Sequence, residues 1–152
     1  MKLTENLSLA EVTKSATAIR MSIANTPSAT HLIALKEVSK NIFQLCREHF
    51  GKPLAVTSGY RSEALNEAIN GSKTSQHSKG EALDLDADVF GGFSNAELFN
   101  YIKDHLDFDQ LIWEFGNNNN PAWVHCSYKT RGNRNEVLIA IKTNNQTTYR
   151  KL

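Results

Sequence analysis

Two short stretches of this sequence restrict most strongly what the chain can form. The first reads Ser75-Gln76-His77-Ser78-Lys79-Gly80-Glu81-Ala82-Leu83-Asp84, and Trp123-Val124-His125 follows about forty residues later. His77, Asp84 and His125 can supply three protein ligands to a zinc ion and leave the fourth position for water, as in catalytic sites. On one straight helix His77 and Asp84 would share a face, but Gly80 and the polar run before it favour a loop that leads into a strand.

Composition and charge bound the class of protein. The chain has 152 residues, which suits a single domain (1–152) with a core that needs no disulfides. Its 17 basic and 16 acidic side chains nearly cancel, and no basic block indicates a nucleic-acid partner. No apolar run approaches the ~20 residues that span a bilayer. The basic start has no apolar segment behind it, so we expect no signal peptide and no membrane insertion. Cys46 and Cys126 form no CxxC pair, and we expect a cytoplasmic monomer with reduced thiols.

Apolar periodicity predicts mainly helices in the first half of the chain. Ser8 and Glu11 have the spacing of a capping box, which predicts a short helix over 8–17. A longer helix should begin at Ser28 or Thr30 and run to about His49. A strand over 54–58 and a helix over 63–69 are expected next.

The second half predicts mainly strands. The expected elements are a strand over 82–86, a helix from Ser94 to about His105, strands over 108–115 and 123–129, and a hairpin of 137–141 with 147–150. Helices come first and antiparallel strands dominate later, so the predicted fold class is α+β.

Several motifs together resemble one known family. They are Ser58-Gly59-Tyr60-Arg61-Ser62, Leu65-Asn66, Gly71-Ser72, Ser75-Gln76-His77, Gly80-Glu81-Ala82-Leu83-Asp84 and Trp123-Val124-His125-Cys126-Ser127-Tyr128. Over most of the chain, from about Leu7 to Tyr128, the sequence resembles the M15 family of zinc peptidases. These are D-alanyl-D-alanine carboxypeptidases, dipeptidases and related phage endolysins that cut the stem peptides of peptidoglycan. The small single-domain members common in phages and prophages are the most similar.

The resemblance implies a fold and a ligand set. It implies the fold shared by these enzymes and the Hedgehog signalling domain, with N-terminal helices packed on a central antiparallel sheet. It also implies that His77, Asp84 and His125 bind zinc.

The general base is the point at which this sequence departs from the family. Many members carry an Asp or Glu three residues before the second histidine, where this chain has Ala122. If 108–115 and 123–129 pair as antiparallel strands, Glu114 lies opposite residues near His125. Directly opposed side chains are about 4.5–5.5 Å apart at Cβ. We therefore predict that Glu114 is the base, with Asp109 as the reserve; the alternative for Glu114 is a charged residue at the hairpin rim.

Other residues are candidates for substrate contacts. The resemblance implies that Arg61 binds a substrate carboxylate or steadies the oxyanion, tasks that suit an arginine fork. Ser75 and Gln76 either bind the substrate backbone or only shape their loop. Trp123 either lines the pocket or packs in the core. Tyr60 either stacks in the cleft or packs beneath it.

The remaining polar residues have weaker signals. Asp86 and Asp88 could orient ligand histidines, but solvated carboxylates at a strand end are the favoured interpretation. His31, His49 and His105 match no motif and are interpreted as surface or helix-end residues.

These features predict a zinc peptidase that cuts a bond in the stem peptide of peptidoglycan, with zinc as cofactor. The alternatives are a carboxypeptidase or dipeptidase acting on D-Ala-D-Ala or small peptides, a catalytically silent zinc domain that binds wall peptide or a partner, and a structural phage component. We expect synthesis in the cytoplasm and action on the cell wall after phage-type release.

Overall fold

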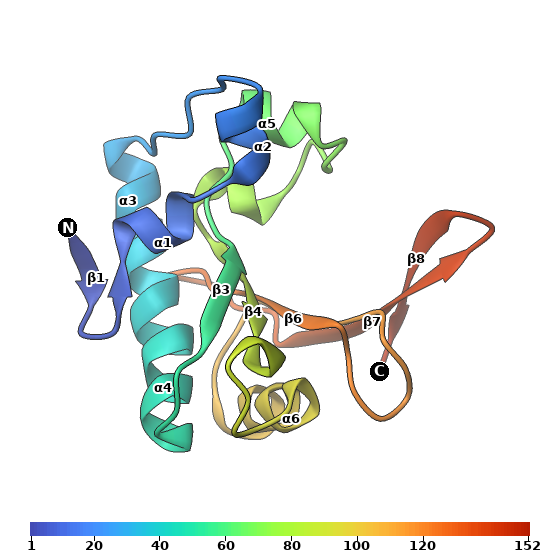
Figure 1. Ribbon diagram of the computed structural model, residues 1–152. Helices are drawn as coiled ribbons and strands as arrows, with labels where there is room; N and C mark the ends of the chain where they lie inside the picture. The colour runs from blue at the N-terminus through green and yellow to red at the C-terminus, as the bar shows by residue number, and fades with distance from the viewer.

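The computed structural model describes residues 1–152 as a mixed α+β fold with one main sheet (Figure 1). The sheet has six strands in the order β3-β4-β6-β5-β7-β8. These strands are β3 (Ala55–Ser58), β4 (Ala82–Asp86), β5 (Gln110–Glu114), β6 (Trp123–Ser127), β7 (Glu136–Thr143) and β8 (Gln146–Lys151). The predicted fold class is confirmed, and no helix is long and apolar enough to cross a membrane.

The N-terminal helices differ in detail from the prediction. The capping box of Ser8 and Glu11 is present, but the expected helix over 8–17 is two helices, α1 (Leu9–Thr13) and α2 (Ala16–Arg20). The break occurs because the Ser15 side chain accepts a hydrogen bond from the Ala18 N–H and so caps a new helix. A small ribbon of β1 (Lys2–Thr4) and β2 (Leu7–Ser8), which the sequence did not predict, precedes them.

The long helix predicted to end near His49 is present. Ser28 rather than Thr30 caps it, and it consists of α3 (Ala29–Val38), a π-helical segment η1 (Ser39–Phe43) and α4 (Gln44–Phe50). The later helical segments are α5 (Glu63–Ala68), η2 (Gln76–Lys79), η3 (Ala87–Val89) and α6 (Asn95–His105).

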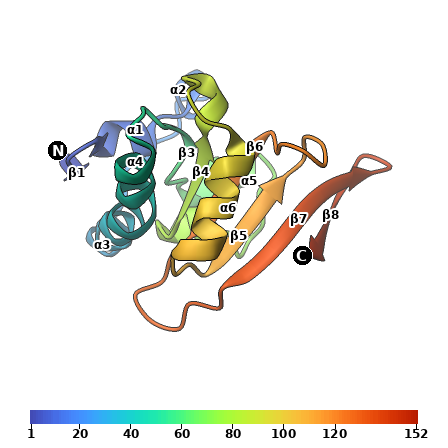
Figure 2. The same ribbon diagram turned by 90° about the horizontal axis from the view of Figure 1, so that it is seen from below.

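The core lies between the helices and one face of the sheet (Figure 2). Leu83, Leu111 and Cys126 are register partners on that face and are fully buried. Phe99 of α6 meets Trp113 of β5 edge-on with ring centroids 5.2 Å apart. Because side chains alternate along a strand, Asp84, Ile112, Glu114 and His125 lie on the opposite face.

The sheet is not wholly antiparallel, which corrects the expected architecture. β5 and β6 pair antiparallel as predicted, but β5 and β7 pair parallel, and β7 and β8 form the terminal hairpin. The connection of residues 128–135 leads from the end of β6 to the start of β7, which lies beside the start of β5, where the Glu136 N–H donates to the Asp109 carbonyl. The hairpin rises from the edge of the sheet (Figure 1), so it can form one side of the open face.

Candidate metal centre and cleft

A short turn presents His77 to the open face of the sheet. The Ser75 side chain accepts a hydrogen bond from the His77 N–H, and Gly80 ends the 3₁₀ turn with φ +74°. A Cβ at Gly80 would collide with the His31 carbonyl oxygen, so this position requires glycine both for its conformation and for its space. The expected loop before the strand is therefore a 3₁₀ turn that leads into β4.

The imidazole of His77 is oriented for metal binding. Its Nδ1 lies 2.7 Å from the carbonyl oxygen of Gly59, which fixes the proton on Nδ1 and leaves the lone pair on Nε2. That Nε2 is buried and has no hydrogen-bond partner. Gly59 itself is wedged against α1, where a Cβ would overlap the Val12 carbonyl oxygen. The Ser58-Gly59-Tyr60-Arg61 stretch thus provides the backbone acceptor that sets the ring.

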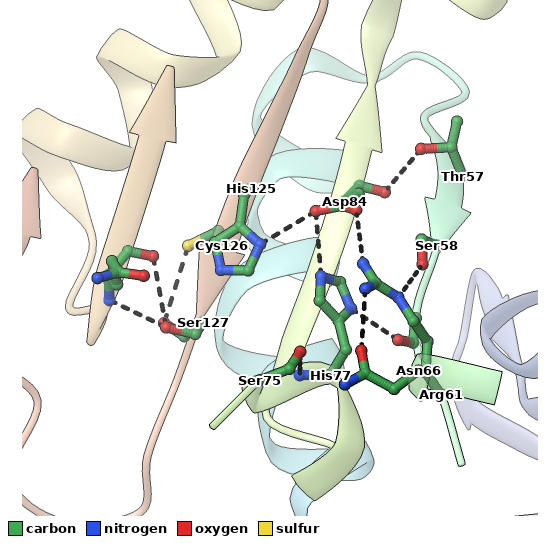
Figure 3. Close-up of polar contacts among 12 residues, drawn as sticks. Thr57, Ser58, Arg61, Asn66, Ser75, His77, Asp84, His125, Cys126 and Ser127 are labelled. Atoms are coloured by element: carbon green, nitrogen blue, oxygen red, sulfur yellow. Dashed lines mark hydrogen bonds and ion pairs between the residues drawn. The ribbon is translucent and has the colours of Figure 1, made fainter. Parts of the chain in front are cut away.

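Register brings the other two candidate ligands to the same place. Asp84 of β4 is the direct partner of His125 of β6. The Oδ1 atom of Asp84 lies 3.1 Å from His125 Nδ1 and 3.3 Å from His77 Nε2 (Figure 3). Burial alone would raise the pKa of Asp84, but the two imidazoles outweigh burial and hold this pKa well below its usual range.

The three side chains fit a zinc ion. Each offers one ligand atom, and these atoms lie within 4.8 Å of one another, so the cluster could hold a metal ion. Two imidazoles and one carboxylate form a donor set that suits zinc better than the hard cations that prefer oxygen alone. The Nε2 of His77 is buried, makes no hydrogen bond and faces the Asp84 carboxylate at 3.3 Å, an arrangement that suits a metal ion held by both groups.

Arg61 lies against the outer oxygen of Asp84. Its Nη2 is 3.5 Å from Asp84 Oδ2, its Nε donates to Ser58 Oγ at 3.1 Å, and its Nη1 lies 3.5 Å from Asn66 Oδ1 (Figure 3). The guanidinium is therefore held at the cluster by partners on β3 and α5, and it lines the cleft. A cation at this position can share negative charge that develops beside the cluster.

Glu114 is buried on the same face of the sheet as the cluster. It pairs with Trp123, two pairs beyond the Ile112–His125 pair and therefore on the same face of the sheet, and the residue is 7% exposed. Burial raises the pKa of Glu114 from 4.5 to about 7, with a further upward contribution from Asp84 and opposing ones from His125 and Arg61. A carboxylate with this pKa, set in the cleft, is suited to take and return a proton near neutral pH.

Glu114 lies beside Ala122, the position at which the sequence lacks the expected carboxylate. The Ala122 N–H donates to the Glu114 carbonyl oxygen at 2.9 Å across the hairpin. Strand β5 thus brings Glu114 beside the start of β6, next to Ala122.

Asp109, the reserve base, is engaged elsewhere. It is fully buried, and Arg134 binds it through Nε at 3.0 Å to Oδ1 and Nη2 at 2.8 Å to Oδ2. Gln76 Nε2 donates to Oδ2 at 3.0 Å. Burial by itself would raise the pKa of Asp109, but these donors lower it to about 2. Such a carboxylate is a poor proton acceptor at neutral pH, so the geometry favours Glu114.

The cluster opens into a cleft of about 860 Å³. Of the predicted substrate contacts, Ser75, Gln76 and Trp123 line this cleft, with Ser75 and Gln76 also engaged in the hydrogen bonds described above. Tyr60 does not line it. The residue is 6% exposed and packs in the core, with its ring 5.2 Å from the His31 ring, which favours packing over stacking in the cleft.

The weaker candidates lie away from the cluster. Asp86 and Asp88 accept hydrogen bonds from Asn95, and Asp88 also from Asn120, so neither orients a ligand histidine. His49 stacks on Tyr101 with ring centroids 3.9 Å apart, and His105 continues that stack.

The sequence interpretation missed the outer wall of the cleft. This wall is formed by Lys129, Arg134, Leu138, Thr147 and Tyr149. They follow the recognisable motifs and have no motif of their own. The loop between β6 and β7 carries Lys129 and Arg134 to the cleft, and the curl of β7 and β8 brings the other three there. Tyr149 pairs with Ala140, which pairs with Glu114; burial and then the charge of Glu114 raise the pKa of Tyr149, which indicates that the two side chains are near each other.

This fold and cluster define a class of protein: an α+β domain with a His, Asp and His cluster in an open cleft that could hold a metal ion. Comparison with protein families agrees, because the family model described as Peptidase M15 matches residues 5–127. The chain belongs to the M15 peptidase family, whose members are zinc peptidases in general, and membership implies a metallopeptidase. A search of curated proteins finds no match.

Proposed function

We propose that this protein is a zinc-dependent peptidase that hydrolyses a peptide bond in the stem peptide of bacterial peptidoglycan. The observation that carries the catalytic part is the position of Glu114, a buried carboxylate with a pKa near 7 on the same sheet face as His125 and Asp84. The choice of substrate is supported by the resemblance of the motifs to enzymes that cut stem peptides. On the same basis we propose the Hedgehog and DD-peptidase type of fold.

The proposed roles follow from the positions of the side chains. His77, Asp84 and His125 would hold the zinc ion, which when bound would act as a Lewis acid toward the scissile carbonyl and the attacking water. Glu114 would accept the proton of that water and deliver it to the leaving amine. Arg61, fixed by Ser58 and Asn66, would share the negative charge that develops on the carbonyl oxygen.

The substrate contacts are proposed from the cleft. Ser75, Gln76 and Trp123 line it close to the cluster, where they would contact the peptide on either side of the scissile bond. Tyr60 is left out of this set because it is buried in the core and does not line the cleft.

The catalytically silent alternative is disfavoured by one observation. A domain that only bound zinc and peptide would have no use for a buried carboxylate beside the cluster, and burying one without a partner costs free energy. Glu114 has no hydrogen bond from another side chain, and Asp84, Arg61 and His125 are the charges that act on it.

The proposal is tested by incubating purified sacculi and synthetic stem peptides with the zinc-loaded protein and identifying the products by mass spectrometry. A free amine released at one internal bond would support an endopeptidase, and release of a terminal D-alanine would support the carboxypeptidase alternative. A His77→Ala variant serves as control, because it should lose both zinc and hydrolysis. If the zinc-loaded protein releases nothing from either substrate, the proposed function is wrong.

A further inference from the structure

The outer wall of the cleft is formed by residues that follow the part of the sequence matched by the family model. The family match ends at residue 127, whereas Lys129 and Arg134 of the β6–β7 connection and Tyr149 of β8 line the cleft. What this wall recognises is therefore a property of this chain.

The charges of the cleft are separated between its two parts. Asp84 and Glu114 are the carboxylates that line it. Asp84 is a candidate metal ligand, and Glu114 is the proposed base. Away from the cluster the lining includes Lys79, Lys129 and Arg134 and no carboxylate. A surface of this kind attracts a negatively charged group of the ligand.

Arg134 is held in place for such a contact. Its backbone N–H, Nε and Nη2 all donate to the buried carboxylate of Asp109, and Lys129 Nζ lies 3.8 Å from the same carboxylate. The remaining nitrogen, Nη1, makes no hydrogen bond and lies 3.8 Å from Glu136 Oε1. The Arg134 side chain is 50% exposed. One side of the guanidinium is thus fixed, while the other is available to a ligand in the cleft.

The same carboxylate ties Arg134 to the metal centre. Gln76 donates to Asp109 and directly precedes the candidate ligand His77 on η2. Arg134 therefore has a defined position relative to the cluster, although it lies on a connecting loop. Such a fixed position is what a specificity contact requires, because a preorganised fork loses little freedom when it binds.

We propose that Arg134, assisted by Lys129, binds a carboxylate group of the peptide substrate and sets which peptides the enzyme accepts. The inference rests on the proposed peptidase function and adds the class of substrate, an acidic peptide. The carboxylate has two possible sources, the C-terminus of the peptide or an acidic side chain within it. Arg61 lies at the opposite side of the cluster, against Asp84, and contributes to the chemistry rather than to this contact.

The test uses three synthetic stem peptides that differ by single groups: a free acid, its C-terminal amide, and a form whose internal acidic side chain is an amide. The kcat and KM of each are measured for the wild-type enzyme and for Arg134→Gln, both loaded with zinc. We expect Arg134→Gln to raise KM for the free acid by about 10- to 100-fold, as expected for loss of a charge-assisted contact. The kcat should stay within about twofold, because the contact acts on ground and transition states alike.

The amide peptides identify the source of the carboxylate. The amide that removes the contacted group should already have a high KM with the wild type and should show no further rise with Arg134→Gln. If that amide is the C-terminal one, the enzyme reads the chain end. If it is the internal one, the enzyme reads an acidic residue.

Two variants separate recognition from folding, because Arg134→Gln leaves the buried Asp109 with fewer donors. Lys129→Met keeps the Asp109–Arg134 pair and should raise KM by a smaller factor, about threefold, with the same dependence on the carboxylate. Arg131→Gln removes the same charge from an exposed residue of the same loop that does not line the cleft, and it should leave KM unchanged.

The possible outcomes distinguish the two proposals. Hydrolysis by the wild type with an equal KM for all three peptides, or an unchanged KM in folded Arg134→Gln, would overturn the carboxylate contact and leave the peptidase function standing. An equal rise of KM in Arg131→Gln would show that the loss of any positive charge on this loop has the same effect, and it would also overturn the proposed contact of Arg134. No hydrolysis of any peptide by the zinc-loaded wild type would overturn the peptidase function, and this inference with it.

Discussion

Glu114 ends strand β5 and Asp109 immediately precedes it. Both residues are buried, yet their acidities differ widely. The pKa of Glu114 is raised to about 7 and that of Asp109 is lowered to about 2. Burial raises both values. The difference comes from hydrogen bonds, because Asp109 accepts them from Arg134 and Gln76, whereas no side chain donates to Glu114.

The comparison shows that burial alone does not identify a catalytic carboxylate. A buried carboxylate that is fully supplied with donors is a structural anchor, here for the loop that starts β7. A buried carboxylate without donors, beside a metal cluster, keeps its proton affinity for use in a reaction. The same change, from carboxylate to amide, should therefore have opposite consequences at the two positions.

The largest expected effect is on turnover. Glu114→Gln removes the proton acceptor without removing a candidate ligand, so we expect kcat to fall by ~10²–10⁴-fold with zinc content and fold retained. Asp109→Asn should lower kcat by less than about tenfold, because it acts only by loosening Gln76 and Arg134. Steady-state kinetics on a synthetic stem peptide and elemental analysis check this. Equal losses in the two variants would contradict the assignment of the base.

The second effect is on the stability of the metal-free protein. Glu114 binds its proton more tightly in the folded state, so its contribution to stability is present below about pH 4.5 and is lost as pH rises toward 7. After chelation of metal at about pH 8, Glu114→Gln should therefore raise the free energy of unfolding by about 3 kcal/mol. Urea denaturation measures this. The gain should disappear near pH 4, where wild-type Glu114 is protonated, and a gain that persists there would indicate another cause.

The third effect is also on the free energy of unfolding, but it is a loss rather than a gain. The pKa of Asp109 is lower in the folded state, so its contribution is present above about pH 4 and is lost as pH falls through 2. Asp109→Asn should lower the free energy of unfolding by about 2 kcal/mol at neutral pH. The loss is measured by the same denaturation experiment, with exposed Asp104→Asn as the matched control. Destabilisation by less than the control would show that the buried contacts of Asp109 contribute little.

The smallest effect concerns the pH dependence of activity. A base must be deprotonated, so kcat/KM should fall as pH is lowered through the pKa of Glu114. A bound zinc ion would lower this pKa below the metal-free value of about 7, because a nearby cation favours the carboxylate. Asp109→Asn should shift the midpoint of this acid limb by less than about 0.3 pH units. A larger shift would mean that Asp109 titrates with the active site, and that the two carboxylates are coupled.

The sequence was most informative where spacing and chemistry coincide locally. The capping box at Ser8, the break at Gly80 and the pairing of β5 with β6 follow from turn chemistry and alternation, and the α+β class follows from the order of the elements. The cluster of His77, Asp84 and His125 was indicated by a specific motif. The placement of Glu114 near His125 followed from assuming a simple hairpin around the asparagine-rich loop.

Other features depended on contacts between distant residues and could not be predicted. The choice between Glu114 and Asp109 required knowing which of them meets Arg134, a residue from the next connection. The burial of Tyr60 depended on its packing against His31, and the break between α1 and α2 on which of several serines became a cap.

The sequence by itself determined the types of ligand atoms, their order along the chain and the strands that carry them, because these depend on local spacing and on alternation along a strand. Only the tertiary structure decided the outer wall of the cleft. The path of the connecting loop sets the parallel pairing of β7 with β5 and carries Lys129 and Arg134 to the cleft, and the curl of the hairpin brings Tyr149 to the same cleft. No local pattern records such a path, since its stability comes from contacts such as Asp109 with Arg134 that join residues far apart in the chain.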